Sequence, residues 1–384
     1  MQQLVRKAAE PAPDGAVMDE VAQQVVGAAV PGFIARIDDG RGAERTALGV
    51  ADREADRAIQ ATDQFQIGSI TKAFMATLCL QLVDEGKVDL DAPVAEYLPG
   101  VAPNGKKITV RMLLNHTSGL FDYIDDDKFW ASWETNPERL WTEDQLLAMA
   151  FPHGPNFEPG ESWGYSNTGY IVIGKLLQKV AGQNLPELVD ERITAPLGLK
   201  KTYLPETVAT NIDQGYARGY SVKFDGASLE YTDTAAWPID GRAGAAGAMI
   251  SDQDDLAVFV SALFAGKLFS DEQLTQLKTV VDLPAAYRSE NAYGLGVHRV
   301  VTPCGTVWGL RGQTDGHQSF AMATEDGKRT AVSDVTAVPY GDEWNDGMRR
   351  WSEVTEAAEV VTLCQMLGKP APASVGARLR GTPG

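Results

Sequence analysis

Gly68-Ser69-Ile70-Thr71-Lys72 begins the stretch that decides the fold, because it leads into the apolar run Ala73-Phe74-Met75-Ala76-Thr77-Leu78-Cys79-Leu80-Gln81-Leu82-Val83. A run that is apolar on nearly every side predicts a helix at the centre of a core. Ser69 and Lys72 lie three residues apart, and therefore on one face of this helix near its N-terminus. There the amine can accept the serine proton, and the positive end of the helix dipole favours the oxyanion that forms. The spacing predicts a nucleophilic serine; the alternative is an N-cap serine beside a solvated lysine.

A second candidate motif lies further along the chain. Tyr165-Ser166-Asn167 is the one Tyr-x-Asn sequence present, and Leu113-Leu114-Asn115-His116-Thr117-Ser118-Gly119-Leu120 stands between it and Ser69. Together with Tyr293-Gly294-Leu295-Gly296, these motifs resemble those of the penicillin-recognising serine enzymes, whose second motif supplies a further acid/base group. The resemblance is to class C β-lactamases, esterases and D-Ala-D-Ala carboxypeptidases, and in particular to secreted actinomycete carboxypeptidases. It extends from about Val30 to Pro370, which is nearly the whole chain.

The resemblance implies a role for each residue of these motifs. Ser69 is the expected nucleophile, and Lys72 and Tyr165 are the expected acid/base groups, with the first proton acceptor left open between them. A tyrosine is a poor base unless a cation lowers its pKa, and Lys72 is the cation expected to do so. Asn167 is expected to bond to Lys72 and to a substrate amide. The oxyanion hole that acyl transfer requires is expected from the backbone N–H groups of Ser69 and Gln313.

The third motif departs from the family pattern. The family carries His-Thr-Gly or Lys-Thr-Gly, whereas this chain reads Val307-Trp308-Gly309-Leu310-Arg311-Gly312-Gln313, so that only Gly312 is retained. The missing cation and hydroxyl hold the substrate carboxylate in the family. Leu310 is otherwise a core residue. Arg311 can point to solvent or, as a planar fork, bind a carboxylate or phosphate.

Four other residues match positions that bind substrate in the family. His298 and Arg299 stand where the carboxypeptidases carry an arginine, and a shift of one residue would restore that match. Trp237 and Phe129 match positions that line the cleft, although either can be a packing aromatic. Because the carboxylate-binding groups are altered, we expect that the site does not bind a free C-terminal carboxylate.

Composition excludes several classes of partner. The chain has 384 residues and a formal net charge of -18, which argues against nucleic acid, heparin or an anionic membrane as a partner. No run of 18 apolar residues is present, so we expect no membrane-spanning helix. Residues 1–10 contain no apolar core of a signal peptide. This predicts a cytoplasmic protein, or a secreted one from which a signal has been removed.

The cysteines and histidines do not indicate a metal site. The four histidines lack metal-ligand spacing, so we expect no metal and no cofactor; His116 is expected to be structural. Cys79 lies on the buried helix and is expected to be inert. By resemblance, Cys304 and Cys364 match positions that are bridged in the secreted relatives. A reducing cytoplasm would disfavour that bridge.

The order of elements predicts an antiparallel sheet flanked by terminal helices, with a helical insertion, because hairpins connect the predicted strands. We expect helices at 16–29, 143–149, 168–180 and 343–367, and strands at 32–37, 46–50, 294–300, 306–310, 318–324 and 329–335. We expect an α/β domain from 16–85 and 245–370, an all-α, mostly helical domain at 86–244, and a loose tail at 371–384.

One serine motif competes with Ser69. Gly160-Glu161-Ser162-Trp163-Gly164 satisfies the nucleophile elbow of α/β-hydrolases, which requires a preceding strand and a following helix. Asn156-Phe157-Glu158-Pro159 precedes it and is not typical of a strand, so we do not favour Ser162.

Three functions are consistent with these motifs. The favoured hypothesis is a serine transacylase, amidase or esterase that forms an acyl-enzyme at Ser69, acts on a small ester or amide in antibiotic-type metabolism, and passes the acyl group to water or an amine. The second is a D-Ala-D-Ala carboxypeptidase or β-lactamase with a degenerate third motif. The third is a noncatalytic binder of β-lactams or peptidoglycan fragments.

Overall fold

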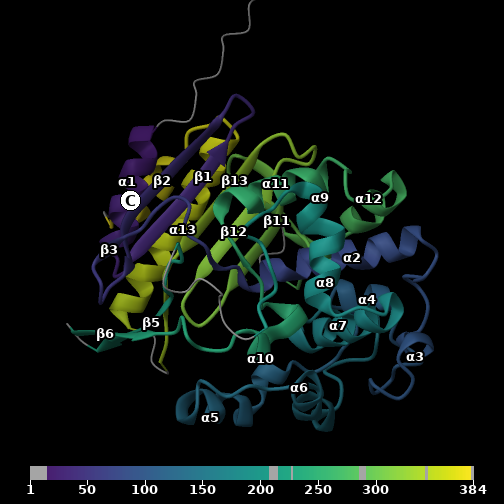
Figure 1. Ribbon diagram of the computed structural model, residues 1–384. Helices are drawn as coiled ribbons and strands as arrows, with labels where there is room; N and C mark the ends of the chain where they lie inside the picture. The colour runs from purple at the N-terminus through teal and green to yellow at the C-terminus, as the bar shows by residue number, and fades with distance from the viewer. Residues whose placement is uncertain (1–14, 207–214, 226–227, 285–290, 342–344, 382–384) are drawn as a thin grey trace, which may run out of the picture.

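The central feature of the fold is a nine-stranded antiparallel sheet with the strand order β3-β2-β1-β13-β12-β11-β10-β9-β8 (Figure 1). The computed structural model describes residues 15–206, 215–225, 228–284, 291–341 and 345–381. The sheet strands are β1 (Gly32–Asp38), β2 (Ala43–Asp52), β3 (Arg57–Ala58), β8 (Val281–Asp282), β9 (Ala292–Tyr293), β10 (His298–Thr302), β11 (Gly305–Gln313), β12 (Gln318–Ala323) and β13 (Thr330–Val335). Phe33 of β1 pairs with Val335 of β13, so the sheet joins the two ends of the chain.

Helices cover both faces of this sheet, as its alternating side chains require. Helices α1 (Gly15–Val26) and α13 (Asp346–Met366) pack on one face, where Val21 and Val354 are fully buried. Helices α2 (Thr71–Asp84) and α11 (Gln253–Phe264) cover the other face, and Phe74 stacks on Phe259 with 3.6 Å between ring centroids. Since α2 lies between the sheet and the helical insertion, its side chains are buried on every side.

The insertion between α2 and β7 is mainly helical and includes α5 and α6 at the bottom of Figure 1. Its helices are α3 (Val94–Tyr97), α4 (Val110–Leu114), α5 (Asp127–Thr135), α6 (Glu143–Ala150), α7 (Asn167–Ala181), α8 (Leu185–Val189), α9 (Ala195–Leu197) and α10 (Asp240–Ala243). A hairpin of β5 (Tyr220–Asp225) and β6 (Ser228–Asp233) was not predicted, and β5 pairs in parallel with β14 (Ala337–Pro339). The remaining elements are β4 (Phe65–Gln66), β7 (Ile250–Ser251) and α12 (Asp271–Lys278).

The predicted fold class is confirmed, with one strand shifted. The strand predicted at 294–300 begins only at His298. Gly296 has a φ of 73°, and a side chain there would approach the carbonyl oxygen of Lys72 to 2.9 Å, so this segment turns tightly over α2 instead of extending. The division into domains stays a prediction. Residues 1–10, 343–344 and 382–384, to which parts of the sequence predictions refer, lie outside the described residues.

The prediction of a loose C-terminal tail is wrong for the described part of that segment. Residues Ala373–Arg380 form helix α14, and its Val375 and Leu379 are buried in the cluster that includes α1 and α13. The guanidinium of Arg350 donates to the carbonyl oxygens of Arg378 and Leu379, 2.7 Å away in each case. The Arg378 carbonyl also accepts from the backbone N–H of Gly381 at 3.1 Å, whereas the Leu379 carbonyl lies in the last turn, where intrahelical partners are lacking. Tertiary contacts therefore stabilise a short helix that its sequence alone would not maintain.

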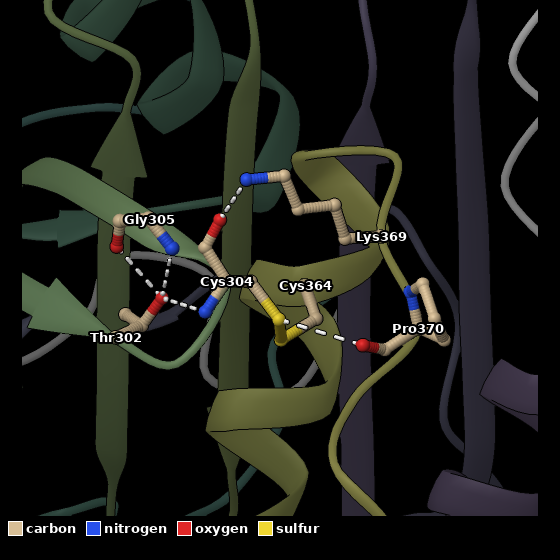
Figure 2. Close-up of a disulfide and its surroundings, with 6 residues drawn as sticks. All are labelled: Thr302, Cys304, Gly305, Cys364, Lys369 and Pro370. Carbon is tan, nitrogen blue, oxygen red and sulfur yellow. Dashed lines mark hydrogen bonds between the residues drawn. A yellow bond between two sulfur atoms is a disulfide. The ribbon is translucent and has the colours of Figure 1, made fainter.

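A disulfide joins Cys304, in the turn between β10 and β11, to Cys364 of α13 (Figure 2). The turn is held further by the amine of Lys369, which donates to the carbonyl oxygen of Cys304 at 2.6 Å. The bridge therefore ties the sheet to the terminal helix. Cys79 is free and fully buried, and burial raises the pKa of its thiol to about 12, consistent with an unreactive cysteine. None of the helices in the described part of the chain combines the length and apolar character needed to span a bilayer.

Candidate active site

Ser69 lies at the point where the buried helix meets the end of strand β11. A short 3-10 turn, Gly68–Ile70, precedes α2, so Ser69 is partly exposed while Lys72 is fully buried. Gly68 has a φ of 50°, and a side chain on it would come within 2.6 Å of the backbone nitrogen and oxygen of Gln313. Glycine is therefore required at position 68, because it lets the end of β11 approach the residue next to the serine.

Two polar side chains contact the Ser69 hydroxyl, and a third, Asn167, contacts one of them. The Lys72 Nζ lies 3.0 Å from the Ser69 Oγ, and the Tyr165 hydroxyl donates to the same Oγ at 2.7 Å. Lys72 also donates to the Asn167 Oδ1 and to the carbonyl oxygen of Ala246, each at 2.7 Å. The structure therefore brings together the four residues predicted to be catalytic.

The partners of Lys72 suit a neutral amine. Asn167 Oδ1 and the Ala246 carbonyl can only accept hydrogen bonds, so they occupy the two N–H groups of a neutral amine and direct its lone pair toward the Ser69 hydroxyl. Burial lowers the pKa of Lys72 to about 7, against an opposing influence of Asp122. A neutral lysine is thus available near pH 7. After it takes a proton, the ammonium has three acceptors already in position.

Tyr165 does not have the properties of a base. Burial raises its pKa well above 10, the bond to Ser69 opposes that rise, and Asp122 adds to it. The expectation that Lys72 lowers the pKa of Tyr165 is therefore wrong, because desolvation of the buried ring is the largest influence on it. The geometry favours Lys72 as the first proton acceptor and Tyr165 as a hydroxyl that donates.

His116 packs against the ring of Tyr165, which is consistent with the structural role predicted for it. Its Nδ1 accepts from the backbone N–H of Ser166 at 3.2 Å, its Nε2 lies 3.2 Å from the Tyr293 hydroxyl, and its ring lies 4.3 Å from that of Tyr165. Burial lowers the pKa of His116 well below its ordinary value, so the imidazole is neutral.

Asp122 is a residue of this site that sequence reasoning missed. Its Oδ2 accepts from both the backbone N–H and the side-chain amide of Asn167, at 2.8 and 2.9 Å. It is 3% exposed, and burial raises its pKa to about 6 while Asn167 and Lys72 oppose the rise. The available signal was an acidic residue two positions after the Ser118-Gly119-Leu120 motif, which on its own has no catalytic spacing.

The altered third motif forms one wall of a cavity of about 940 Å³ beside Ser69. Its lining includes Tyr165, His298, Leu310, Arg311, Gly312 and Gln313. Arg311 is held by Glu359 of α13, with its Nε 2.8 Å and its Nη2 2.6 Å from Glu359 Oε1. Burial, together with Arg311 and Lys72, lowers the pKa of His298 to about 3, so His298 is neutral. Leu310 is apolar and buried, so this wall offers a substrate anion little beyond an already paired arginine.

Three predicted substrate contacts are absent from the described lining of this cavity. Arg299 follows His298 on β10 and is not among the residues that line the cavity. Trp237 and Phe129 are buried in an aromatic cluster that includes Trp133 and Arg242. Both match the packing alternative considered for them.

The aromatic cluster contacts the turn that follows β11. The Trp133 Nε1 donates to Asp315 Oδ1 at 2.9 Å, and Arg242 pairs with Asp315 Oδ2 at 3.3 Å. Asp315 lies two residues after Gln313, so these contacts join helix α5 of the insertion to the end of the strand beside the serine. The oxyanion-hole role of the Ser69 and Gln313 amides stays a prediction. Ser162 is exposed in a loop, with no strand before it among the described residues.

Comparison with known proteins gives the family. The family model described as "Beta-lactamase" matches residues 2–346. This chain belongs to the beta-lactamase family. The family is one of serine hydrolases, and it includes the penicillin-recognising enzymes that the motifs resemble.

Two solved structures are similar over most of their length. A D-stereospecific amidohydrolase from Streptomyces sp. is 35% identical, with a TM-score of 0.76 over 85% of this chain and 95% of that one. A D-amino acid amidase from Ochrobactrum anthropi SV3, complexed with L-phenylalanine amide, is 27% identical, with a TM-score of 0.78 over 90% of this chain and 97% of that one. Penicillin-binding protein 4* of Bacillus subtilis is 32% identical over 177 residues, which are 45% of this chain and 38% of that protein. The chain thus matches less than half the length of that relative.

Proposed function

We propose that this protein is a serine hydrolase that forms an acyl-enzyme at Ser69 and acts on amides or esters whose carboxyl group is blocked. The observation that carries the proposal is the arrangement at Ser69, with Lys72 Nζ at 3.0 Å and the Tyr165 hydroxyl at 2.7 Å. A nucleophile within hydrogen-bond reach of a base, which is itself oriented by a third group, is typical of covalent catalysis. Asn167 is the orienting group for Lys72.

The proposed reaction has two halves. Ser69 Oγ attacks the substrate carbonyl carbon while its proton passes to the neutral Lys72 amine, and the carbonyl oxygen becomes an oxyanion at the amides of Ser69 and Gln313. The bond to the leaving amine or alcohol then breaks as Tyr165 donates a proton to it and recovers one from Lys72. Water, or an amine acting as acyl acceptor, attacks the ester at Ser69 with Lys72 again as base and releases the product.

The cavity wall supports a substrate without a free carboxylate. Anion binding in such a site needs a cation or hydroxyl that is not already satisfied. Here Leu310 is apolar, His298 is neutral, and Arg311 is held by Glu359 at hydrogen-bond distance. Arg378 also lines the cavity, but it comes from α14, which packs against α1 and α13, and is not part of the wall that the third motif forms. An amide or ester has no charge at this position and needs no cation there.

The substrate class proposed is a D-amino acid amide or ester. Its support is the likeness to the D-stereospecific amidohydrolase and the D-amino acid amidase, both covered over most of their length. The likeness to Penicillin-binding protein 4* keeps a carboxypeptidase or β-lactamase as the second candidate, although the cavity wall disfavours it. Transfer to an amine in antibiotic-type metabolism and noncatalytic binding remain further alternatives. The disulfide favours an oxidising compartment over the cytoplasm.

A substrate panel tests this proposal. D-phenylalanine amide, its L enantiomer, D-phenylalanine methyl ester, benzylpenicillin and a D-Ala-D-Ala peptide are compared by kcat/KM in wild type and in Ser69→Ala. The expected result is turnover of the D-amide and D-ester, weak acylation by penicillin, and no turnover by Ser69→Ala. Rapid stoichiometric acylation of Ser69 by micromolar penicillin would favour the second candidate. Formation of amides between the acyl group and added amines would indicate acyl transfer. An unreactive Ser69 would indicate a noncatalytic binding protein.

A further inference from the structure

Asp122 is connected to the reacting lysine through a single side chain. Asn167 donates its side-chain amide to Asp122 Oδ2 at 2.9 Å and accepts from Lys72 Nζ at its Oδ1 at 2.7 Å. An amide has a donating and an accepting end, so the carboxylate determines which end of Asn167 faces the lysine. If the amide were reversed, its NH₂ group would face the Lys72 amine, and its oxygen would face the carboxylate.

We infer that Asp122 is a positioning residue of the reaction, which fixes the orientation of the Asn167 amide and sets the charge balance of Lys72. The inference rests on the proposed acyl-enzyme function. A second bond, from the backbone N–H of Asn167 to Asp122 Oδ2 at 2.8 Å, ties the carboxylate to the first residue of α7. Asp122 also accepts from the backbone N–H of Ile124 at 3.4 Å, so its own turn is fixed.

The surroundings leave Lys72 and Asp122 as the pair that titrates near neutral pH. The other charged or titratable groups that influence them are Tyr123, Asp125, His116, His298, Tyr165, Tyr170 and Arg242. Burial keeps the two histidines neutral and raises the pKa of each of these tyrosines. Asp125 is exposed, and Arg242 pairs with Asp315. The carboxylate of Asp122 is therefore the charge that favours the protonated form of Lys72.

The substitution Asp122→Asn separates charge from geometry. An asparagine oxygen can still accept both bonds from Asn167, but the side chain has no negative charge, and its NH₂ group replaces the oxygen that accepts from Ile124 at 3.4 Å. Loss of the charge should lower the pKa of Lys72, so the acid limb of the pH profile should move to lower pH by about one unit. Asp122→Ala removes both bonds, and its plateau rate should fall by up to about 100-fold. Asp125→Asn is the matched control, because solvent screens this exposed charge and the limb should stay in place.

Two readouts keep this inference separate from the proposed function. The first is the rate at which a fluorophosphonate labels Ser69 between pH 5 and 9, which needs no knowledge of the substrate. The second is an NMR titration of the Lys72 side chain in wild type and in Asp122→Asn, which needs no reaction at all. A Lys72 titration that is the same in both proteins overturns the inference, whereas a downward shift supports it. Failure of the fluorophosphonate to label wild-type Ser69 counts against the proposed function alone, since the titration still decides the role of Asp122.

Discussion

Burial of Lys72 gives its amine the pKa that a base needs near neutral pH. The residue is fully buried, and its pKa is lowered to about 7 because the charged form is poorly solvated there. A lysine with an ordinary pKa would be protonated at neutral pH and unable to accept the serine proton. The cost of burying the amine is offset by three acceptors, of which two are fixed by the fold around α7 and residue 246.

The pH dependence of acylation follows from this lowered pKa. Because Lys72 acts as a base only when deprotonated, kcat/KM should fall as the pH drops through about 7 and reach a plateau above it. Lys72→Ala should lower acylation by roughly 10²–10⁴-fold and remove that limb. Tyr165→Phe should lower the rate by a similar factor but keep the limb, because it removes only the donated hydroxyl.

The measurement is a pH–rate profile of each variant with the best substrate of the panel. A limb that is kept in Lys72→Ala but lost in Tyr165→Phe would identify the tyrosine as the base instead. Circular dichroism of each variant provides the control for intact folding.

The Ser-x-x-Lys spacing predicted Ser69 and Lys72 as a nucleophile and a base, whereas the roles of Tyr165 and Asn167 came from the resemblance to the penicillin-recognising enzymes. Three residues along a helix bring Ser69 and Lys72 to one face, but only tertiary packing brings Tyr165 and Asn167 to them. Asp122 could not be found in this way, because a single acidic residue in a turn becomes meaningful only when tertiary packing buries it against Asn167. The bond between Arg311 and Glu359 was hidden for the same reason, since 48 residues separate the two.

At the scale of elements, strand β11 combines two tasks in alternate residues. Leu310 and Gly312 face the side of the sheet that α2 covers, where Leu310 belongs to the same core cluster as Phe74. Arg311 extends toward Glu359 on α13. Alternation along a strand therefore separates the residue that shapes the core from the residue that binds the terminal helix. The strand could be predicted from its apolar pattern, but the partner of Arg311 could not.

Restoring the family's third motif should change the preference of the site. In Leu310→His/Arg311→Thr/Glu359→Gln, a cation and hydroxyl become available, and the partner of Arg311 is neutralised so that no buried carboxylate is left unpaired. Acylation by penicillin or a D-Ala-D-Ala peptide should rise, and kcat/KM on the amide should fall, because the new polar groups stay unpaired on a neutral substrate.

Arg311→Thr/Glu359→Gln is the matched control, since it removes the ion pair and keeps Leu310. The comparison is the ratio of kcat/KM values for the two substrate classes in each protein. If the triple variant has the same ratio as the control, the third motif does not select the substrate, and residues 121–155 of the insertion become the place to search.

Contacts between elements that lie far apart in the sequence were the part of the fold that was hardest to predict. The hairpins of the main sheet follow from alternating patterns and turn residues, and β1, β11, β12 and β13 were predicted close to their observed bounds. The strand predicted at 294–300 is instead shifted to His298–Thr302. Helix α14 was missed because its Pro, Ser and Gly neighbours are typical of a loop, and its stability comes from Val375, Leu379 and the guanidinium of Arg350. Local sequence does not contain that information.

At the scale of the whole molecule, the disulfide links the sheet to α13 and closes a loop with a sequence separation of 60. Loop-closure entropy for such a loop predicts a contribution of about 4 kcal/mol to the free energy of unfolding. Cys304→Ser/Cys364→Ser should lose roughly that amount in urea denaturation and should become insensitive to a thiol reductant.

Cys79→Ala is the control, because it removes the free buried thiol and keeps the bridge. It should retain the full effect of reductant on the denaturation midpoint. A wild-type protein whose midpoint is unchanged by reductant would show that the bridge is not formed in solution or contributes nothing to stability.

The pairing of β1 with β13 has a consequence for biosynthesis. Phe33 meets Val335 in the sheet, so the first strand must wait for ~300 further residues, which is roughly 15 to 60 s of ribosomal translation. During this interval β1 can pair with β2 but lacks its other partner, β13, and α2 lacks β11 until Gly305–Gln313 has been synthesised. A nascent chain arrested before Thr330 should therefore resist labelling at Ser69 even though every catalytic side chain has already been synthesised. We therefore expect Ser69 to become reactive only late in translation, when the two ends of the chain pair in the sheet.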